Sequence, residues 1–177
     1  LFGLRDGLAA DLAAAGRVGE QVIAAVRAAL GHSEALVATS VARGQEHLGL
    51  LVSRQGVTLA QPQLHPCGRH PWCSALGDAL HTFDAPFGRL AVIVGPDAIY
   101  PETFRLAALA DVDIVAAPAQ PLEAWEMALG MPERAAENRL NVVVAARPTG
   151  AGHSAIFAAS PDFTLWTEWR TRPFEGN

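Results

Sequence analysis

The sequence predicts a layered α/β fold built on a mixed β-sheet. Two observations favour this fold class. Apolar runs separated by short turn motifs, which are typical of hairpins, fill the middle of the chain, and strand patterns alternate with helix patterns in its later part. The chain has 177 residues and half of them are hydrophobic, which is enough for a sizeable core. A single domain over 1–177 is therefore the expectation.

The first third of the chain indicates a helical region followed by three strands. Residues 5–30 are rich in Ala and Leu at helical spacing, and Gly16 within them predicts either two short helices or one interrupted helix. Residues 35–42 form an apolar run that is typical of a buried strand. Residues 47–64 predict two strands that are joined by a turn over 54–56.

A loop and a second hairpin occupy the middle of the chain. Residues 65–78 are rich in His, Pro, Cys and Gly, which predicts a loop. Residues 80–95 predict a hairpin that turns over 85–88. A helix over 101–110 and a short buried strand over 112–118 follow, so helix and strand patterns alternate from this point.

The last third continues this alternation. Residues 122–138 predict one long helix, and residues 140–147 predict a buried strand. A further hairpin is predicted over 152–166, around 160–162, and the tail that follows carries two Trp and two Arg residues. These are too few for a nucleic-acid platform, so the tail is interpreted as an edge strand or a segment that packs on a partner.

Composition excludes several classes of protein. The net charge is −5 and no basic stripe is present to neutralise phosphates, so no nucleic-acid partner is expected. No apolar run approaches the ~20 residues that span a bilayer. The start of the sequence lacks a signal-peptide pattern, so a cytoplasmic location without a membrane partner is expected. Two cysteines make no disulfide framework, and all 13 basic residues are Arg, so this chain has no lysine chemistry.

Residues 91–104 hold the most informative motif. An apolar run ends at Gly95, and a helix pattern begins near Pro101. A buried strand that ends in a sharp turn before a helix is a favourable place for a nucleophile. Here the residue at the turn is glycine, which has no side chain that could attack a carbonyl.

With its surroundings, this motif resembles the carbon–nitrogen hydrolase (nitrilase) superfamily over roughly residues 18–165. The shared pattern is a Gly before an apolar strand, an Asp after the nucleophile position, Pro-Glu opening a helix, a strand ending in Pro, Arg-Ala-x-Glu-Asn, another strand and Gly-x-Ser. The matching positions are Phe87-Gly88, Leu90 to Val94, Asp97, Pro101-Glu102, Val112 to Pro118, Arg134-Ala135, Glu137-Asn138, Val142 to Ala145, Gly152 and Ser154. No single piece is specific, but their order and spacing agree.

The resemblance implies an α-β-β-α sandwich, commonly dimerised, and hydrolysis of an amide or nitrile by a Glu, Lys and Cys triad. In this sequence the nucleophile position holds Gly95 and the lysine position holds Gln63. The strand that would carry the Glu belongs upstream of Leu1. The domain is therefore expected to span 1–177 without its first strand and last segment, and its catalytic residues are left unknown.

The motifs and the resemblance together place a candidate cleft around the turn. Its candidate residues are Gly95, Pro96, Asp97, Glu102, His65, Cys67 and Gln120. Two of them also have plain structural interpretations. Asp97 can hold the turn by accepting backbone N–H bonds, and Glu102 suits the first turn of a helix.

The loop over 65–78 also carries four side chains that can bind zinc. They are His65, Cys67, His70 and Cys73. Their spacing matches no common zinc pattern, and four ligands this close would need a tight knuckle. Neither a metal nor another cofactor is therefore expected.

These observations leave more than one function open. The leading hypothesis is a catalytically impaired domain that binds a small molecule, or that serves as a dimerising regulatory domain through the helices at 101–110 and 122–138. A homodimer, or a place in a larger assembly, is expected. The alternative is an active amidase that uses Cys67 or Cys73 as an unusual nucleophile, or groups from missing sequence.

Overall fold

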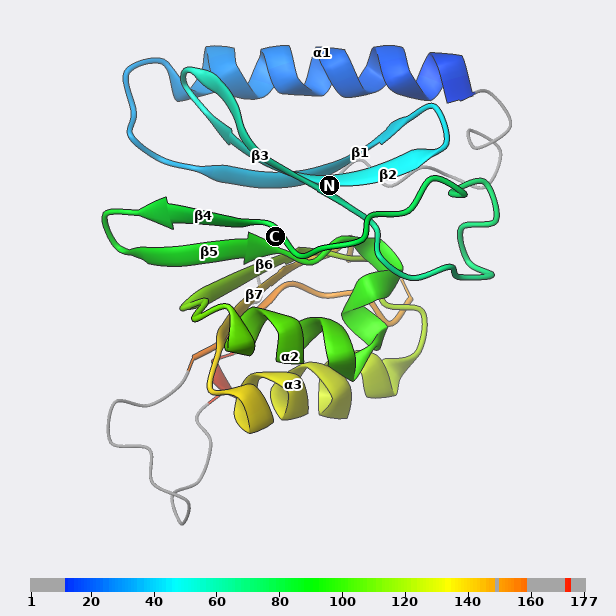
Figure 1. Cartoon of the computed structure of the whole chain (residues 1–177), viewed down its shortest axis with the longest axis vertical. Helices are drawn as coiled ribbons and strands as arrows, with labels where there is room; N and C mark the ends of the chain where they lie inside the picture. The colour runs from blue at the N-terminus through cyan, green and yellow to red at the C-terminus, as the bar shows by residue number, and fades with distance from the viewer. Residues whose placement is uncertain (1–11, 149, 159–170, 173–177) are drawn as a thin grey trace.

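The computed structural model describes residues 12–148, 150–158 and 171–172, and these form an α-β-β-α sandwich (Figure 1). One helix covers a three-stranded sheet, a six-stranded sheet lies behind that, and two helices cover the far face (Figure 1). The layered α/β class and the sandwich implied by the resemblance are both confirmed. None of the helices in the described ranges combines the length and apolar composition needed to cross a membrane.

The outer helix of the first half, α1 (Leu12–Leu30), runs through Gly16 without a break. The predicted interruption is therefore wrong in the described part of the helix. An interior glycine costs a helix only about 0.5–1 kcal/mol, and tertiary packing offsets this. Ile23 provides that packing, since it lies in one apolar cluster with Val41 and Leu48 of the sheet beneath.

The first sheet is an antiparallel meander of three strands, β1 (Val37–Arg43), β2 (Glu46–Ser53) and β3 (Gly56–Pro62). Both predicted strand regions and the turn between the second and third strands are confirmed. β2 lies in the centre and is buried along almost its whole length. A central strand of this kind is covered on one face by α1 and on the other by the second sheet.

The second sheet has the order β4-β5-β6-β7-β8-β9 and is mixed. The strands are β4 (Thr82–Ala85), β5 (Gly88–Val92), β6 (Ile114–Pro118), β7 (Asn141–Ala145), β8 (Ala155–Phe157) and β9 (Thr171–Arg172). The central β5–β6 and β6–β7 pairs are parallel, and the outer pairs are antiparallel. The turn predicted over 160–162 and the two Trp residues of the tail lie outside the described residues.

The two sheets meet face to face and approach closely at Gly49. Leu51 and Leu59 of the first sheet pack against Leu90 and Val92 of the second. Gly49 allows the approach, because a Cβ at this position would lie 2.5 Å from a methyl group of Val92. The absence of a side chain therefore brings β2 and β5 together, and the site described below lies at one end of these two strands.

The second pair of helices contains a π-helical turn. α2 (Pro101–Leu109) is a plain α-helix, whereas the predicted long helix over 122–138 is a π turn over Glu126–Gly130 followed by α3 (Met131–Asn138). The N–H of Met131 reaches back to the carbonyl of Glu126. Pro132 has no N–H to continue the α pattern, which accounts for the wider turn before it.

Candidate functional site

Gly95 stands at the turn that the sequence singled out. It follows β5 and opens a short 3₁₀ helix, Gly95–Ile99, which leads into α2. Its φ of +52° lies in the left-handed region, which glycine adopts at little cost. The strand, sharp turn and helix predicted at this point are therefore confirmed.

The ring of His47 lies directly against Gly95. A Cβ built on Gly95 would collide with Cε1 of His47, would lie 2.9 Å from its Nδ1 and would lie 3.3 Å from Cε1 of His70. Such distances are too short for a side chain to fit unless the rings move. The space into which a nucleophile at position 95 would project is thus filled by imidazole.

The hydrogen bonds of His47 fix its position and its charge. Its Nδ1 donates to Oε1 of Gln63 at 3.0 Å, and Nε2 of Gln63 donates to the carbonyl of His65 at 2.6 Å. Burial, reinforced by the neighbouring His70, lowers the pKa of His47 to about 4. The ring is therefore neutral at neutral pH, and Gln63, which is fully buried, uses both ends of its amide.

His47 belongs to an aromatic cluster with two residues of the loop between β3 and β4. The ring of His70 lies 4.8 Å from that of His47, and the ring of Trp72 lies 5.5 Å from each of them. Sequence reasoning did not identify His47 or Trp72 as site residues. His47 is an ordinary strand residue by pattern, and only the packing of the two sheets places it over Gly95.

Asp97 anchors the same loop to the turn. Its carboxylate accepts backbone N–H bonds from Leu64 at 2.7 Å and His65 at 2.9 Å, and it lies 3.0 Å from Nδ1 of His65. Asp97 accepts backbone N–H bonds as predicted, but the donors belong to a distant segment, so the prediction that these bonds hold its own turn is wrong. Burial raises the pKa of Asp97, although these hydrogen bonds act in the opposite direction.

A second anchor joins the loop to the π turn. Two nitrogens of the Arg69 guanidinium donate to the two carboxylate oxygens of Glu126, at 3.1 and 2.7 Å. Glu126 is nearly buried, and it also accepts the backbone N–H of Glu123 at 3.1 Å. The π turn therefore carries an ion pair that fixes the loop at its centre.

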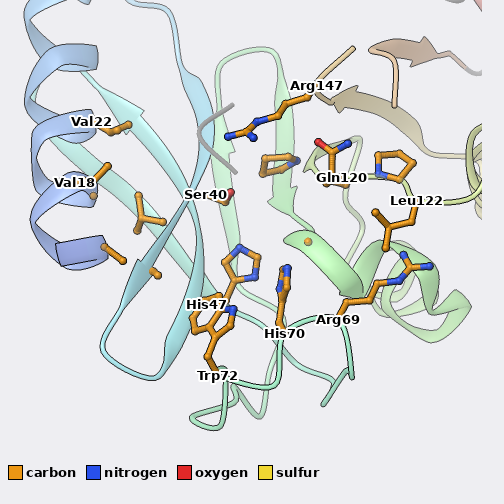
Figure 2. Close-up of a pocket in the computed structure, with 18 of the residues that line it drawn as sticks. Val18, Val22, Ser40, His47, Arg69, His70, Trp72, Gln120, Leu122 and Arg147 are labelled. Carbon is orange, nitrogen blue, oxygen red and sulfur yellow. The ribbon is translucent and has the colours of Figure 1, made fainter. Parts of the chain in front are cut away.

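A cavity of about 440 Å³ opens beside this cluster, between α1 and β1 on one side and the loops after β6 and β7 on the other (Figure 2). Val18 and Val22 of α1 form one wall (Figure 2). The remaining residues that line it include Ser40, Val41, His47, Arg69, His70, Trp72, Gly95, Pro118, Gln120, Leu122 and Arg147. The size suits a small organic molecule.

Only some of the residues that the sequence suggested for the cleft line the cavity. Gly95 and Gln120 line the cavity. Near the turn but not among the lining residues are Pro96, Asp97, His65 and Cys67. Glu102 is exposed at the start of α2 and borders a separate shallow cavity with Arg105 and Asn138.

The cysteines and histidines of the loop do not gather around a common point. In the part of the chain that the structure describes, no three His, Cys, Asp or Glu side chains form a group that could hold a metal ion. Both cysteines are free thiols, and burial raises the pKa of Cys73. The thiol of Cys73 is therefore less readily ionised than an exposed one.

The fold class follows from the layers and from comparison with solved structures: the chain has the fold of the nitrilase-superfamily amidases. An amidase from Nesterenkonia sp. matches with a TM-score of 0.74 at 15% identity, over 88% of this chain and 65% of that one. A serine-for-cysteine variant of the Nesterenkonia AN1 amidase from the nitrilase superfamily matches with a TM-score of 0.72 at 17% identity, over 86% and 64%.

The likeness lies in structure and not in sequence. No protein-family model matches the chain, and no curated protein matches it in sequence. The chain spans just under two thirds of the length of these two amidases. Another structure of the Nesterenkonia AN1 amidase shows the acetamide moiety of fluoroacetamide added covalently at its active-site cysteine. This chain matches that structure with a TM-score of 0.72 at 17% identity, over 86% of this chain and 63% of that one.

Proposed function

We propose that this domain binds a small molecule in the cavity beside Gly95 and does not hydrolyse carbon–nitrogen bonds there. The observation that carries the proposal is the collision that any side chain at position 95 would make with His47. A covalent mechanism needs a nucleophile with free access to the substrate carbon. Here the turn that could present one holds glycine, and a neutral ring covers it.

The surroundings of Gln63 support the same proposal. A triad of the kind implied by the resemblance needs a cation to stabilise charge on the tetrahedral oxygen. Gln63 is neutral, and it is bonded to His47 and to the His65 carbonyl, so its amide is committed to the structure of the loop. The chain contains no lysine that could take over the role.

A relocated cysteine is the competing enzymatic function, and two observations disfavour it. Neither Cys67 nor Cys73 is among the residues that line the cavity. The raised pKa of Cys73 disfavours the thiolate, which is the nucleophilic form. A pocket that binds without hydrolysis therefore accounts for more of the geometry.

The test is ammonia release from a panel of amides and nitriles, with an active amidase as the positive control. We expect no turnover by the wild type or by Cys67→Ser and Cys73→Ser, and we expect small molecules from the same panel to raise its melting temperature. Turnover by the wild type that disappears in either Cys variant would replace the proposal with the enzymatic alternative.

We propose dimerisation through α2 and the π turn as a second function, because large apolar side chains are exposed there. Leu109 is 72% exposed at the end of α2, Leu129 is 67% exposed in the π turn, and Trp125 is 48% exposed just before that turn. Large apolar side chains that stay exposed on one helical layer favour an interaction surface there. A second copy of the chain is the partner that we propose.

A further inference from the structure

The walls of the cavity beside Gly95 are mostly apolar. Val18 and Val22 line it from α1, and Pro121 and Leu122 line it from the loop after β6 (Figure 2). Among the described residues that line the cavity, none is Asp or Glu. Walls of this kind give the apolar body of a ligand extensive contact and give a positive charge no partner.

The two arginines that line the cavity already have partners. Arg69 donates two hydrogen bonds to the carboxylate of Glu126, which lies outside the lining. Arg147 also has a partner. An anion would therefore compete with groups that these guanidinium groups already contact, whereas a cation would meet like charge and no carboxylate. The electrostatics of the cavity favour an uncharged ligand.

His47 gives the cavity one polar group whose role is fixed. Because the amide nitrogen of Gln63 donates to the His65 carbonyl, the amide oxygen is left to accept from Nδ1 of His47. The low pKa of His47 keeps the ring neutral, so Nε2 carries no proton and is an acceptor. Nδ1 and Cε1 are the ring atoms nearest to Gly95. Within the described part of the chain Nε2 makes no hydrogen bond, and the residue lines the cavity.

We propose that the cavity binds an uncharged molecule with an apolar body and a hydrogen-bond donor that reaches Nε2 of His47. This inference rests on the proposed binding function and names its ligand class. A head group that can only accept would leave Nε2 without a partner, which lowers affinity because His47 is buried. An alcohol with one apolar ring fits a cavity of about 440 Å³ and supplies the donor.

Four ligands with the same ring and different head groups test the ligand class. Phenethyl alcohol, its methyl ether, phenylacetate and phenethylammonium are compared by calorimetric titration at neutral pH. We expect phenethyl alcohol to bind most tightly. The methyl ether should bind roughly 10-fold more weakly, because it cannot donate to Nε2. The negative phenylacetate and the positive phenethylammonium should also bind more weakly than the alcohol.

Three variants locate the ligand within the cavity. His47→Asn keeps a donor for Gln63 and removes Nε2, so the alcohol should lose its advantage over the ether. Val18→Asp places a carboxylate on the α1 wall at a position that is 40% exposed, and it should weaken binding of the alcohol by roughly 10-fold or more. Ala25→Asp is the matched control, because Ala25 is exposed on the same helix outside the lining. Equal losses in the two Asp variants would overturn the placement of the apolar body along α1.

The outcomes also separate this inference from the function on which it rests. Equal binding of the alcohol and the ether by the wild type overturns His47 as the acceptor, even where His47→Asn does not fold. Tightest binding of phenylacetate or phenethylammonium overturns the uncharged class and leaves the binding function standing. Ammonia release from phenylacetamide overturns the binding-only function, whatever the alcohol does. Failure of all four probes to bind overturns this inference, and the melting temperatures with the amide and nitrile panel then decide the binding function separately.

Discussion

At the scale of single residues, two independent features require glycine at position 95. Its backbone is left-handed, and its missing side chain leaves room for the His47 ring. Gly44 provides a comparison, because it has a similar φ of +56° and nothing within 4 Å of a built Cβ. Substituting each glycine by alanine therefore distinguishes the cost of a left-handed backbone, which both share, from the cost of a collision with His47, which only Gly95 has.

We predict that Gly95→Ala destabilises the protein more than Gly44→Ala does. Both variants pay about 1–2 kcal/mol for an L-residue in the left-handed region. Only Gly95→Ala adds an overpacking cost of about 1–3 kcal/mol against the imidazole. Urea denaturation measures both free energies of unfolding, and a His47→Ala change should recover part of the loss in Gly95→Ala. Equal losses in the two glycine variants would contradict the collision.

The lowered pKa of His47 predicts a pH dependence of stability. The unfolded chain binds this proton near the ordinary value of 6.5, whereas the folded chain does so only near pH 4. The unfolded state binds more protons between these values, so the contribution of His47 is complete above pH 6.5 and falls as the pH falls toward 4. The loss amounts to about 3 kcal/mol.

The contribution of His47 is isolated by comparing variants. The raised pKa of Asp97 acts in the opposite direction, because it adds stability at low pH that is lost as the pH rises through its folded value. Wild type and His47→Asn share the contribution of Asp97, so the difference between their free energies of unfolding, measured across this pH range, reports His47 alone. His32→Asn, which changes an exposed histidine after α1, should keep the wild-type slope. An unchanged slope in His47→Asn would refute the assignment.

At the scale of elements, the loop between β3 and β4 is held at two points. Asp97 binds its beginning, and the Arg69–Glu126 pair binds its middle to the π turn. The loop supplies His70 and Trp72 to the cavity wall. The irregular turn in the second helical segment is therefore connected to the site through one ion pair.

We predict that Glu126→Gln loosens this loop. The carboxylate is almost buried and bonded in two places to Arg69, so its loss should cost about 1–3 kcal/mol. Glu20→Gln is the matched control, because the Arg43–Glu20 pair is exposed on both sides and such pairs contribute about 0–1 kcal/mol. Limited proteolysis should cut the loop faster in Glu126→Gln only. Similar behaviour of the two variants would show that the pair does not hold the loop.

At the scale of the whole molecule, the site exists because two sheets pack face to face. His47 comes from β2 of the first sheet, and Gly95 follows β5 of the second. Gly49 allows β2 and β5 to approach closely at the neighbouring position. The helices α2 and α3 cover the opposite side of the second sheet, so the proposed dimer surface and the cavity belong to different faces (Figure 1).

We predict that the wild type sediments as a dimer and that Leu109→Asp and Leu129→Asp convert it to a monomer. Each change places a charge at an exposed apolar position of the helical layer without touching the core. Val57→Asp is the control, because Val57 is 41% exposed in β3 of the first sheet, whereas α2 packs on the second sheet. Sedimentation velocity provides the measurement. A wild type that remains monomeric at micromolar concentration would contradict the second proposed function.

The sequence by itself determined most of the layered fold. Alternation and turn residues located β1 to β7 closely, and the strand, turn and helix around Gly95 were evident because glycine and proline interrupt local patterns strongly. Local patterns did not locate the π turn, because a π turn and an α-helix share the same apolar spacing over so few residues. They also overestimated the effect of Gly16, since packing against the sheet outweighs a small helix propensity cost.

Only the tertiary structure decided what the site contains. His47 lies on β2 of the first sheet, and Gly95 follows β5 of the second and is far from His47 in sequence, so no local pattern connects them. The stacking of β2 on β5 places the ring over the turn, and burial there makes the ring neutral. Side-chain identity at position 95 was readable from the sequence, but what occupies the space above it depends on the packing of the two sheets.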